Sequence, residues 1–232
     1  MNMWKKNWVL WVVIIIVASG AIYYAYHKGF FGSLGQLTDL KHPYVTVNLS
    51  DSAKSDFERQ VADIKKQISS KDDKGTGNLM SAYLSLGHVY EELGRRADEV
   101  VAINEASKQD QANPAPLVSL AVVYKDDGQI QRAIDLLKTA LAKRGDYLPA
   151  YQELIKLYWD HLHDNDMTKG TFIDALRATN NSLAIEKGFA VFLEATGDNS
   201  EALLYWQDVV KKEPTNTDAI NRVKALTTPV KK

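Results

Sequence analysis

The sequence contains no cysteine, which excludes disulfide bonds, thiolate metal sites and attachment of a lipid to cysteine. It also lacks a large excess of charge, because 28 basic and 29 acidic side chains leave a net charge of -1. All three charged side chains in residues 1–28 are lysines, so the remainder carries 25 basic and 29 acidic residues, a net charge of -4. No strong attraction to nucleic acid follows, and nucleic acid is not an expected partner.

Catalytic signatures are also absent from the sequence. It has no glycine-rich phosphate loop, no Gly-x-Ser-x-Gly elbow and no His-Glu-x-x-His motif. His88 is more typical of a hydrogen-bonding surface residue than of a general base. We therefore expect a protein that is not an enzyme, with no catalytic residue and no cofactor.

One polar run, Asp160 to Asp166 (DHLHDND), has the residue types of a metal site. Its two histidines are only two positions apart, and residues at that spacing point to different sides of a helix. A calcium loop starting at Asp164 would have Lys169 at the glycine position and Ala175 at the glutamate position. The run is therefore interpreted as a solvated helix end, and no metal site is expected.

The sequence does contain one long apolar run, from Trp8 to Tyr26, with no charged side chain. At about 1.5 Å per residue it is about 28 Å long in a helix, close to the thickness of a bilayer's hydrocarbon core. Aromatic residues gather at both ends, where amphipathic rings meet the two water interfaces: Trp4, Trp8 and Trp11, then Tyr23, Tyr24 and Tyr26. Residues 1–28 are therefore predicted to be a single-pass transmembrane signal anchor.

The alternative for this segment is a cleaved signal peptide. Lys5 and Lys6 would form its basic region, and the small residues Ala18, Ser19 and Gly20 would form its cleavage site. The tyrosines beyond that site favour the retained anchor. The lysines before the apolar run indicate a cytoplasmic N-terminus, which would place the rest of the chain on the extracytoplasmic side.

Three segments follow the anchor. Residues 29–50 are predicted to be a flexible stalk, in which the stretch from Pro43 to Leu49 either packs on a neighbour or stays extended. Residues 51–70 are predicted to form an amphipathic helix with an apolar stripe of Phe57, Val61, Ile64 and Ile68. That stripe is short for a coiled coil, so docking on neighbouring helices is favoured. Residues 71–78 are the predicted linker.

The most informative pattern is an internal repeat. Tyr90, Tyr124 and Tyr158 are spaced by 34 residues, and a leucine precedes each of them by four positions. Gly94 and Gly128 share the same spacing. A fixed period of this length indicates stacked supersecondary units, here pairs of helices joined at a glycine.

This arrangement resembles the tetratricopeptide repeat family over residues 79–226, and residues 227–232 form a tail. The second unit carries the family's pattern at Leu120, Ala121, Tyr124, Gly128, Ala133, Leu137 and Ala140. The first unit departs from it at Glu99, and the third has HLHDNDMTKG in place of a short turn. A fourth unit follows 35 residues after the third, so one residue is added in that loop. The resemblance implies an all-α solenoid of about four helix-turn-helix repeats with a cap helix at Asp218 to Leu226.

The resemblance also implies a concave groove lined by the first helix of each repeat. The inward positions, expected to bind a peptide or protein partner, are Leu84, His88, Glu91, Val118, Val122, Lys125, Gln152, Lys156, Trp159, Lys187, Val191 and Glu194. The lysines and asparagines with which some family members clamp a terminal carboxylate are absent, which leaves Lys125 or Lys156 for that role. Alternatively, the helix at 51–70 fills part of the groove.

The expected function is that of a membrane-tethered interaction scaffold or adaptor that assists assembly or secretion. Two alternatives stay open: a permanent structural subunit of a larger membrane complex, and a secreted soluble adaptor released by signal cleavage. The sequence leaves the identity of the partner and the oligomeric state open.

Overall fold

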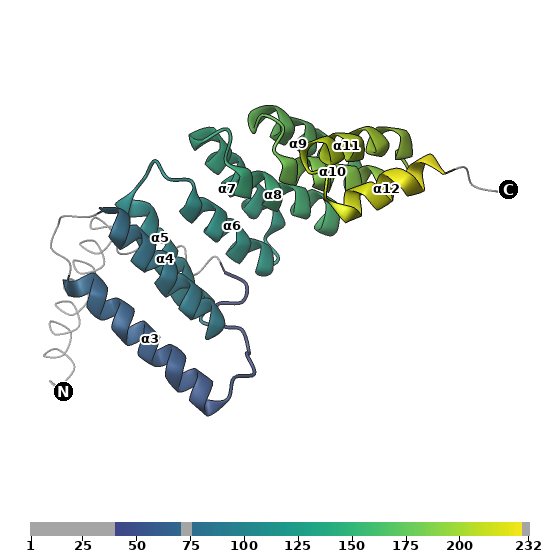
Figure 1. Ribbon diagram of the computed structural model, residues 1–232. Helices are drawn as coiled ribbons and strands as arrows, with labels where there is room; N and C mark the ends of the chain where they lie inside the picture. The colour runs from purple at the N-terminus through teal and green to yellow at the C-terminus, as the bar shows by residue number, and fades with distance from the viewer. Residues whose placement is uncertain (1–39, 71–75, 229–232) are drawn as a thin grey trace, which may run out of the picture. The chain divides into compact units, whose positions relative to one another are not determined.

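A computed structural model describes residues 40–70 and 76–228 of the chain (Figure 1). Within these ranges every regular element is a helix. The chain divides into two compact units, Met1–Asp110 and Gln111–Lys232. The predicted membrane segment at residues 8–26 lies outside the described residues. None of the helices that are described is both long enough and apolar enough to cross a membrane.

In the described part of the first unit, three helices pack around a small core. They are α3 (Asp51–Ser70), α4 (Thr76–Glu92) and α5 (Arg96–Gln109). The Ser50 hydroxyl accepts a hydrogen bond from the Ala53 amide at 3.2 Å and so caps the first turn of α3. The apolar stripe of α3 packs on α4, with Val61 buried against Leu86, Val89 and Tyr90. α4 begins at Thr76, three residues before the predicted start of the repeats at residue 79, and residues 71–75 of the predicted linker lie outside the described residues.

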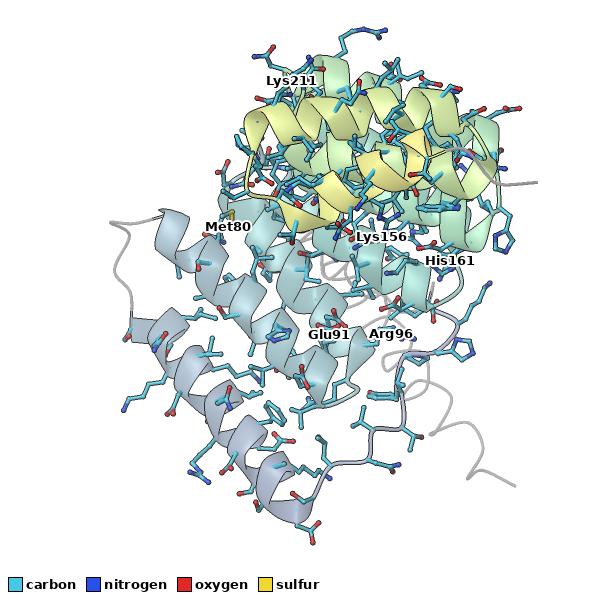
Figure 2. The ribbon with its side chains drawn as sticks, turned by 45° about the vertical axis from the view of Figure 1, so that its right-hand side comes forward. Met80, Glu91, Arg96, Lys156, His161 and Lys211 are labelled. Carbon is cyan, nitrogen blue, oxygen red and sulfur yellow. The ribbon has the colours of Figure 1, made fainter. Side chains whose placement is uncertain are left out.

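The predicted flexible stalk at residues 29–50 is described only from residue 40 onward, and there it packs on a neighbour, one of the two outcomes expected for the stretch from Pro43 to Leu49. Its described part is extended and bound to the turn between α4 and α5: the Val45 amide donates to the Gly94 carbonyl at 2.8 Å, and the Ala97 amide donates to the Pro43 carbonyl at 3.0 Å. Glu91 at the end of α4 and Arg96 at the start of α5 lie on either side of this turn (Figure 2). Helix ends have backbone groups without a partner inside the helix, and here the stalk pairs with two of them.

The second unit contains three helix pairs and a final helix. The helices are α6 (Ala115–Asp126), α7 (Ile130–Lys143), α8 (Leu148–Lys156), the π-turn η1 (Leu157–His161), α9 (Asn165–Ala178), α10 (Leu183–Thr196), α11 (Asn199–Lys212) and α12 (Thr217–Thr227). α6 pairs with α7, α8 with α9 and α10 with α11, while α12 packs on α11. Large rings and small side chains alternate in the core, where Phe189 and Trp206 lie beside the fully buried Ala190 and Ala202. Small residues at these places let the helices approach closely.

The same backbone hydrogen bond closes the turn in three of the described helix pairs: α4 with α5, α6 with α7, and α10 with α11. An amide donates to the carbonyl five residues earlier, at 2.8 Å in each case: Arg95 to Tyr90, Gln129 to Tyr124, and Asp198 to Leu193. Each of these turns contains a glycine with positive φ, namely Gly94 (66°), Gly128 (72°) and Gly197 (88°). This left-handed conformation is readily accessible to glycine, which explains the repeated glycine.

The third helix pair of the described chain, α8 with α9, departs from this rule by one residue. Its closing bond runs from the Asp164 amide to the Tyr158 carbonyl, six residues earlier, at 2.9 Å. The π-turn η1 accommodates part of the extra length, and His163 takes the left-handed conformation with φ of 52°. The residue that shifts the repeat period from 34 to 35 is thus placed between Tyr158 and Asp164.

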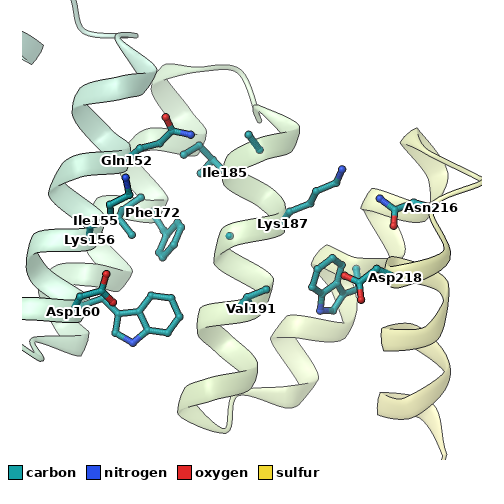
Figure 3. Close-up of a pocket in the computed structure, with 14 residues that line it drawn as sticks. Gln152, Ile155, Lys156, Asp160, Phe172, Ile185, Lys187, Val191, Asn216 and Asp218 are labelled. Carbon is teal, nitrogen blue, oxygen red and sulfur yellow. The ribbon is translucent and has the colours of Figure 1, made fainter. Parts of the chain in front are cut away.

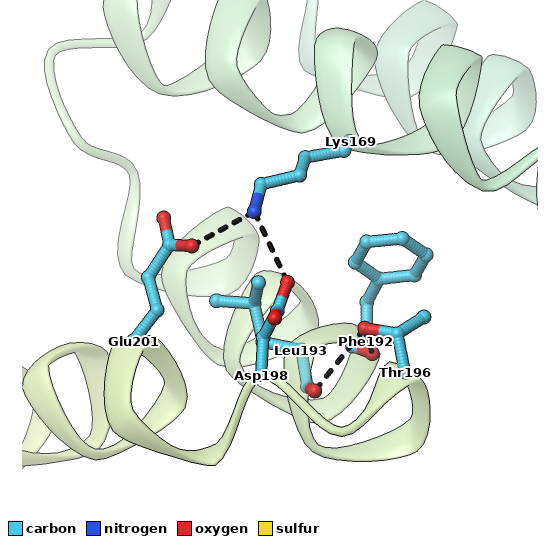
Figure 4. A network of polar contacts seen from close by, with 6 residues as sticks. All are labelled: Lys169, Phe192, Leu193, Thr196, Asp198 and Glu201. Carbon is cyan, nitrogen blue, oxygen red and sulfur yellow. Dashed lines mark hydrogen bonds and ion pairs between the residues drawn. The ribbon is translucent and has the colours of Figure 1, made fainter.

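An ion-pair network secures the helix after this turn. Lys169 of α9 donates to Glu201 at 2.8 Å and to Asp198 at 3.2 Å, which ties α9 to the turn between α10 and α11 (Figure 4). Both carboxylates raise the pKa of Lys169, and the largest cause is the hydrogen bond that Lys169 donates to Glu201. Because the three side chains are partly exposed, each pair contributes at most about 1 kcal/mol, and its main effect is to fix the position of α9.

The glycine turns lead to a testable difference in stability. Gly197→Ala introduces only left-handed strain, about 1–2 kcal/mol, because nothing lies within 4 Å of the added Cβ. Gly94→Ala should cost more, because its Cβ would stand 2.1 Å from the Val45 carbonyl oxygen. Gly170→Ala, in open space within α9, is the control and should stabilise by about 0.5–1 kcal/mol. Denaturant unfolding followed by circular dichroism measures all three. Equal losses for Gly94→Ala and Gly197→Ala would contradict a stalk held against the turn.

Candidate functional site

A groove of about 550 Å³ lies within the second unit, between α8, α10 and the start of α12 (Figure 3). Its lining comes mainly from the first helices of the last two pairs and from the final helix. The lining residues are Gln152, Ile155, Lys156, Trp159, Asp160, Phe172, Ala184, Ile185, Lys187, Gly188, Val191, Trp206, Asn216 and Asp218. This volume falls in the range of about 300–1,000 Å³ that is common for ligand sites.

Aromatic and aliphatic side chains form the floor of the groove. Phe172 and Trp206 reach it from the second helices, and both are almost fully buried. Gly188 makes room for Phe172, because a Cβ at Gly188 would lie only 3.2 Å from that ring. The floor is therefore preformed by the core and needs no rearrangement to accept an apolar side chain.

The π-turn contributes two of the lining residues, Trp159 and Asp160. The Trp159 ring contacts the Phe192 ring edge-on, with centroids 5.4 Å apart and planes at 88°. That geometry is favourable for aromatic pairs and holds the indole at the edge of the groove while it remains partly exposed.

The two lysines of the groove already have carboxylate partners. Lys156 donates to Glu153 at 2.6 Å, and Lys187 donates to Glu213 at 2.6 Å. The hydrogen bond from Lys187, with a second from Asn216, lowers the pKa of Glu213 below its ordinary value of 4.5. Two carboxylates line the groove. The Asp218 carboxylate lies 3.4 Å from the Arg222 guanidinium, whereas the Asp160 carboxylate has no hydrogen bond or ion pair within the described parts of the chain.

Five of the residues expected in a partner groove line this one: Gln152, Lys156, Trp159, Lys187 and Val191. Glu194 does not. Its carboxylate accepts hydrogen bonds from the Trp206 indole and from Arg222, the latter at 3.1 Å, so it joins α10 to α11 and α12. The side chain predicted to face a partner here has an internal structural role instead.

The other expected residues lie elsewhere. Val118, Val122 and Lys125 belong to α6 of the same unit but are not among the lining residues. The Lys125 ammonium lies 3.8 Å from Glu153, the carboxylate that Lys156 also binds. Both lysines considered for carboxylate capture therefore already lie near the same acidic side chain.

Leu84, His88 and Glu91 lie on α4 in the first unit. His88 and Glu91 are exposed and contact each other at 3.1 Å. α3 packs on the α4 face that carries Val89 and Tyr90, so it leaves His88 and Glu91 uncovered. The alternative in which α3 fills the groove therefore does not hold at these two residues.

Sequence reasoning missed Asp160, Asn216 and Asp218. Asp160 was assigned to a polar helix end and Asp218 to the cap helix. Glu92, Asp126 and Asp160 are acidic at a spacing of 34 residues, a signal that could have marked Asp160, whereas no repeat marks Asn216 or Asp218. In the polar run, Asp164 caps α9 by accepting from the Met167 amide at 2.9 Å, and His163 contacts the Trp159 carbonyl at 3.0 Å. Among the residues with a described position, no group of three or more His, Asp or Glu side chains is placed to hold a metal ion.

Comparison with solved structures identifies the fold. No protein-family model matches the sequence, and no curated protein matches it significantly. This chain resembles the crystal structure of MamA with a TM-score of 0.52. The two sequences are 20% identical, and the match covers 75% of this chain and 99% of the MamA chain. The fold is that of tetratricopeptide repeat proteins.

Two further structures agree. A thermophilic tetratricopeptide repeat protein of Thermus thermophilus is 15% identical, with 75% of this chain and 92% of that chain covered and a TM-score of 0.52. A tetratricopeptide repeat protein of Parabacteroides merdae is also 15% identical, with 88% and 72% covered and a TM-score of 0.53. At these identities the likeness establishes the tetratricopeptide repeat fold and carries no information about partners.

The Lys187–Glu213 pair predicts a specific pH dependence. Because the pKa of Glu213 is lowered in the folded state, the pair adds stability above about pH 4.5 and loses it as the pH falls through the lower pKa of the folded state. The stability difference between the wild type and Glu213→Gln should therefore shrink as the pH falls through that window. Carboxyl NMR titration should give Glu213 a pKa below 4.5, and Lys187→Met should return it toward that value. A pKa at or above 4.5 in the wild type would contradict the pair.

Proposed function

We propose that this protein is an interaction module that binds a peptide segment of a partner protein in the groove of the second unit. The observation that carries the proposal is a groove whose floor is made of buried aromatic rings and whose edges are polar. Such a site can hold apolar side chains by burial while polar groups orient the segment. The tetratricopeptide repeat fold is consistent with this role but does not establish it.

We further propose that residues 8–26 tether the module to a membrane with the repeats on the extracytoplasmic side. The support comes from the uncharged run, its aromatic ends and the preceding lysines. The position of the groove in the last repeats is compatible with such a tether, because 125 residues, 27–151, separate the apolar run from the first lining residue. A module of this kind would gather partners beside the bilayer and assist their assembly or secretion.

Peptide selection tests the groove directly. Random short peptides displayed on phage are selected on the full-length protein, and the affinity of each recovered peptide is measured by fluorescence anisotropy. Val191 is 36% exposed and lines the groove, so Val191→Asn places an uncharged polar amide on an apolar surface that the peptide must cover. We expect at least tenfold weaker binding, equivalent to about 1.4 kcal/mol.

The matched control is Leu204→Asn on α11. Leu204 is 64% exposed and does not line the groove, so the same change of side-chain type should leave affinity unaltered. If the recovered peptides bind Val191→Asn as tightly as the wild type, or are weakened equally by both variants, binding lies outside this groove and the proposal is overturned.

Fractionation and protease access test the tether. Deletion of residues 1–28 should move the protein from the membrane fraction to the soluble fraction, because the apolar run supplies the attachment. In sealed right-side-out membranes, added protease should digest residues 29–232 of the full chain. Protection of that region would overturn the orientation, and a mature N-terminus at Ala21 would replace the anchor with a cleaved leader.

A further inference from the structure

We infer that the groove selects peptide segments in which a lysine or arginine lies next to an apolar side chain, with Asp160 as the main cation-binding group. This inference rests on the proposed peptide-binding function and adds the chemical class of the partner. It follows from the charges at the groove and from the way each charge is already paired.

The cations of the groove are held by acidic neighbours. Lys156 and Lys187 each donate to a carboxylate at 2.6 Å, and neither of those carboxylates, Glu153 and Glu213, is among the lining residues. An incoming carboxylate would have to compete with these pairs. Although Glu153 also lies 3.8 Å from Lys125, the two groove lysines offer an anionic peptide less positive charge than two unpaired ammonium groups would.

The acidic side chains that line the groove have fewer oppositely charged partners than its lysines have. Asp160 lies on one side of the groove and Asp218 on the other, with Val191 between them (Figure 3). Asp218 shares Arg222 with Glu194, at 3.4 Å and 3.1 Å respectively. Asp160 has no such partner within the described parts of the chain. The local charge therefore favours a cation, and Asp160 is the carboxylate most available to bind it.

The surroundings of Asp160 also suit a cationic side chain with an apolar stem. Its neighbour Trp159 is partly exposed and held by the Phe192 ring. An aromatic face attracts a guanidinium or ammonium group, and the methylene stem of lysine or arginine covers apolar surface while its charge reaches the carboxylate. Val191 and the ring of Phe172 would then accept the neighbouring apolar side chain.

The π-turn makes this arrangement specific to the third helix pair. Asp126 occupies the corresponding place one repeat earlier, 34 residues before Asp160, but is not among the lining residues of the groove. It is 45% exposed, with its carboxylate 3.5 Å from Lys125. Asp126 is therefore a natural control for Asp160.

The test uses the peptides recovered by phage selection on the full-length protein. Peptides whose binding is lost with Val191→Asn should carry more lysine and arginine than aspartate and glutamate, relative to the unselected library. Asp160→Asn should weaken them about three- to fivefold, as for a partly exposed ion pair, and Asp126→Asn should not. Replacement of the peptide's basic residue by norleucine should remove the difference between the wild type and Asp160→Asn, and the preference should weaken as salt increases.

The outcomes separate this inference from the proposed function. Groove-dependent peptides that are acidic or uncharged, or that bind Asp160→Asn as tightly as the wild type, would overturn the cation preference and leave the groove in place. If no selected peptide depends on Val191, the proposed function itself fails. Circular dichroism of each variant ensures that a loss of binding is not a loss of folding.

Discussion

One backbone hydrogen bond at the turn of each helix pair organises the described structure. The amide just before the second helix donates this bond to a carbonyl near the end of the first helix. In three pairs the loop between the two helices contains a glycine in the left-handed conformation. This closure sets the angle at which the second helix returns, and thereby decides which side chains meet in the core. The alternation of large rings and alanines at Phe189, Ala190, Ala202 and Trp206 is effective only because the helices return in this register.

The pair of α8 and α9 shows what happens when the turn that this hydrogen bond closes is one residue longer. The longer turn between Tyr158 and Asp164 needs a π-turn and a left-handed His163, and π-turns of this kind often occur at functional sites. Here the π-turn carries Trp159 and Asp160, the residues that give the groove its exposed indole and its uncompensated carboxylate. The irregularity in the repeat and the chemistry proposed for the groove therefore have the same structural origin.

Turn closure also has a consequence in the first unit. Its turn leaves the Gly94 carbonyl and the Ala97 amide without helical partners, and the preceding extended segment binds both. The residues from Pro43 to Val45 are thus part of the folded unit rather than a loose stalk. The sequence left open whether this stretch packs on a neighbour or stays extended, because a short β-prone stretch with no sheet partner pairs only with whatever the tertiary structure offers it.

The sequence by itself determined the helix pairs, their number, the amphipathic helix at 51–70 and the extra residue in the third pair, because helical periodicity and turn glycines are local signals. It also indicated five lining residues of the groove, since the first helices of the repeat present equivalent positions. Only the tertiary structure decided that Glu194 binds Trp206 and Arg222, that the groove lysines are already paired, and that Asp160 and Asp218 lie on opposite sides of one groove. Those outcomes depend on side chains distant in sequence, whose meeting is set by helix packing and leaves no periodic mark in the chain.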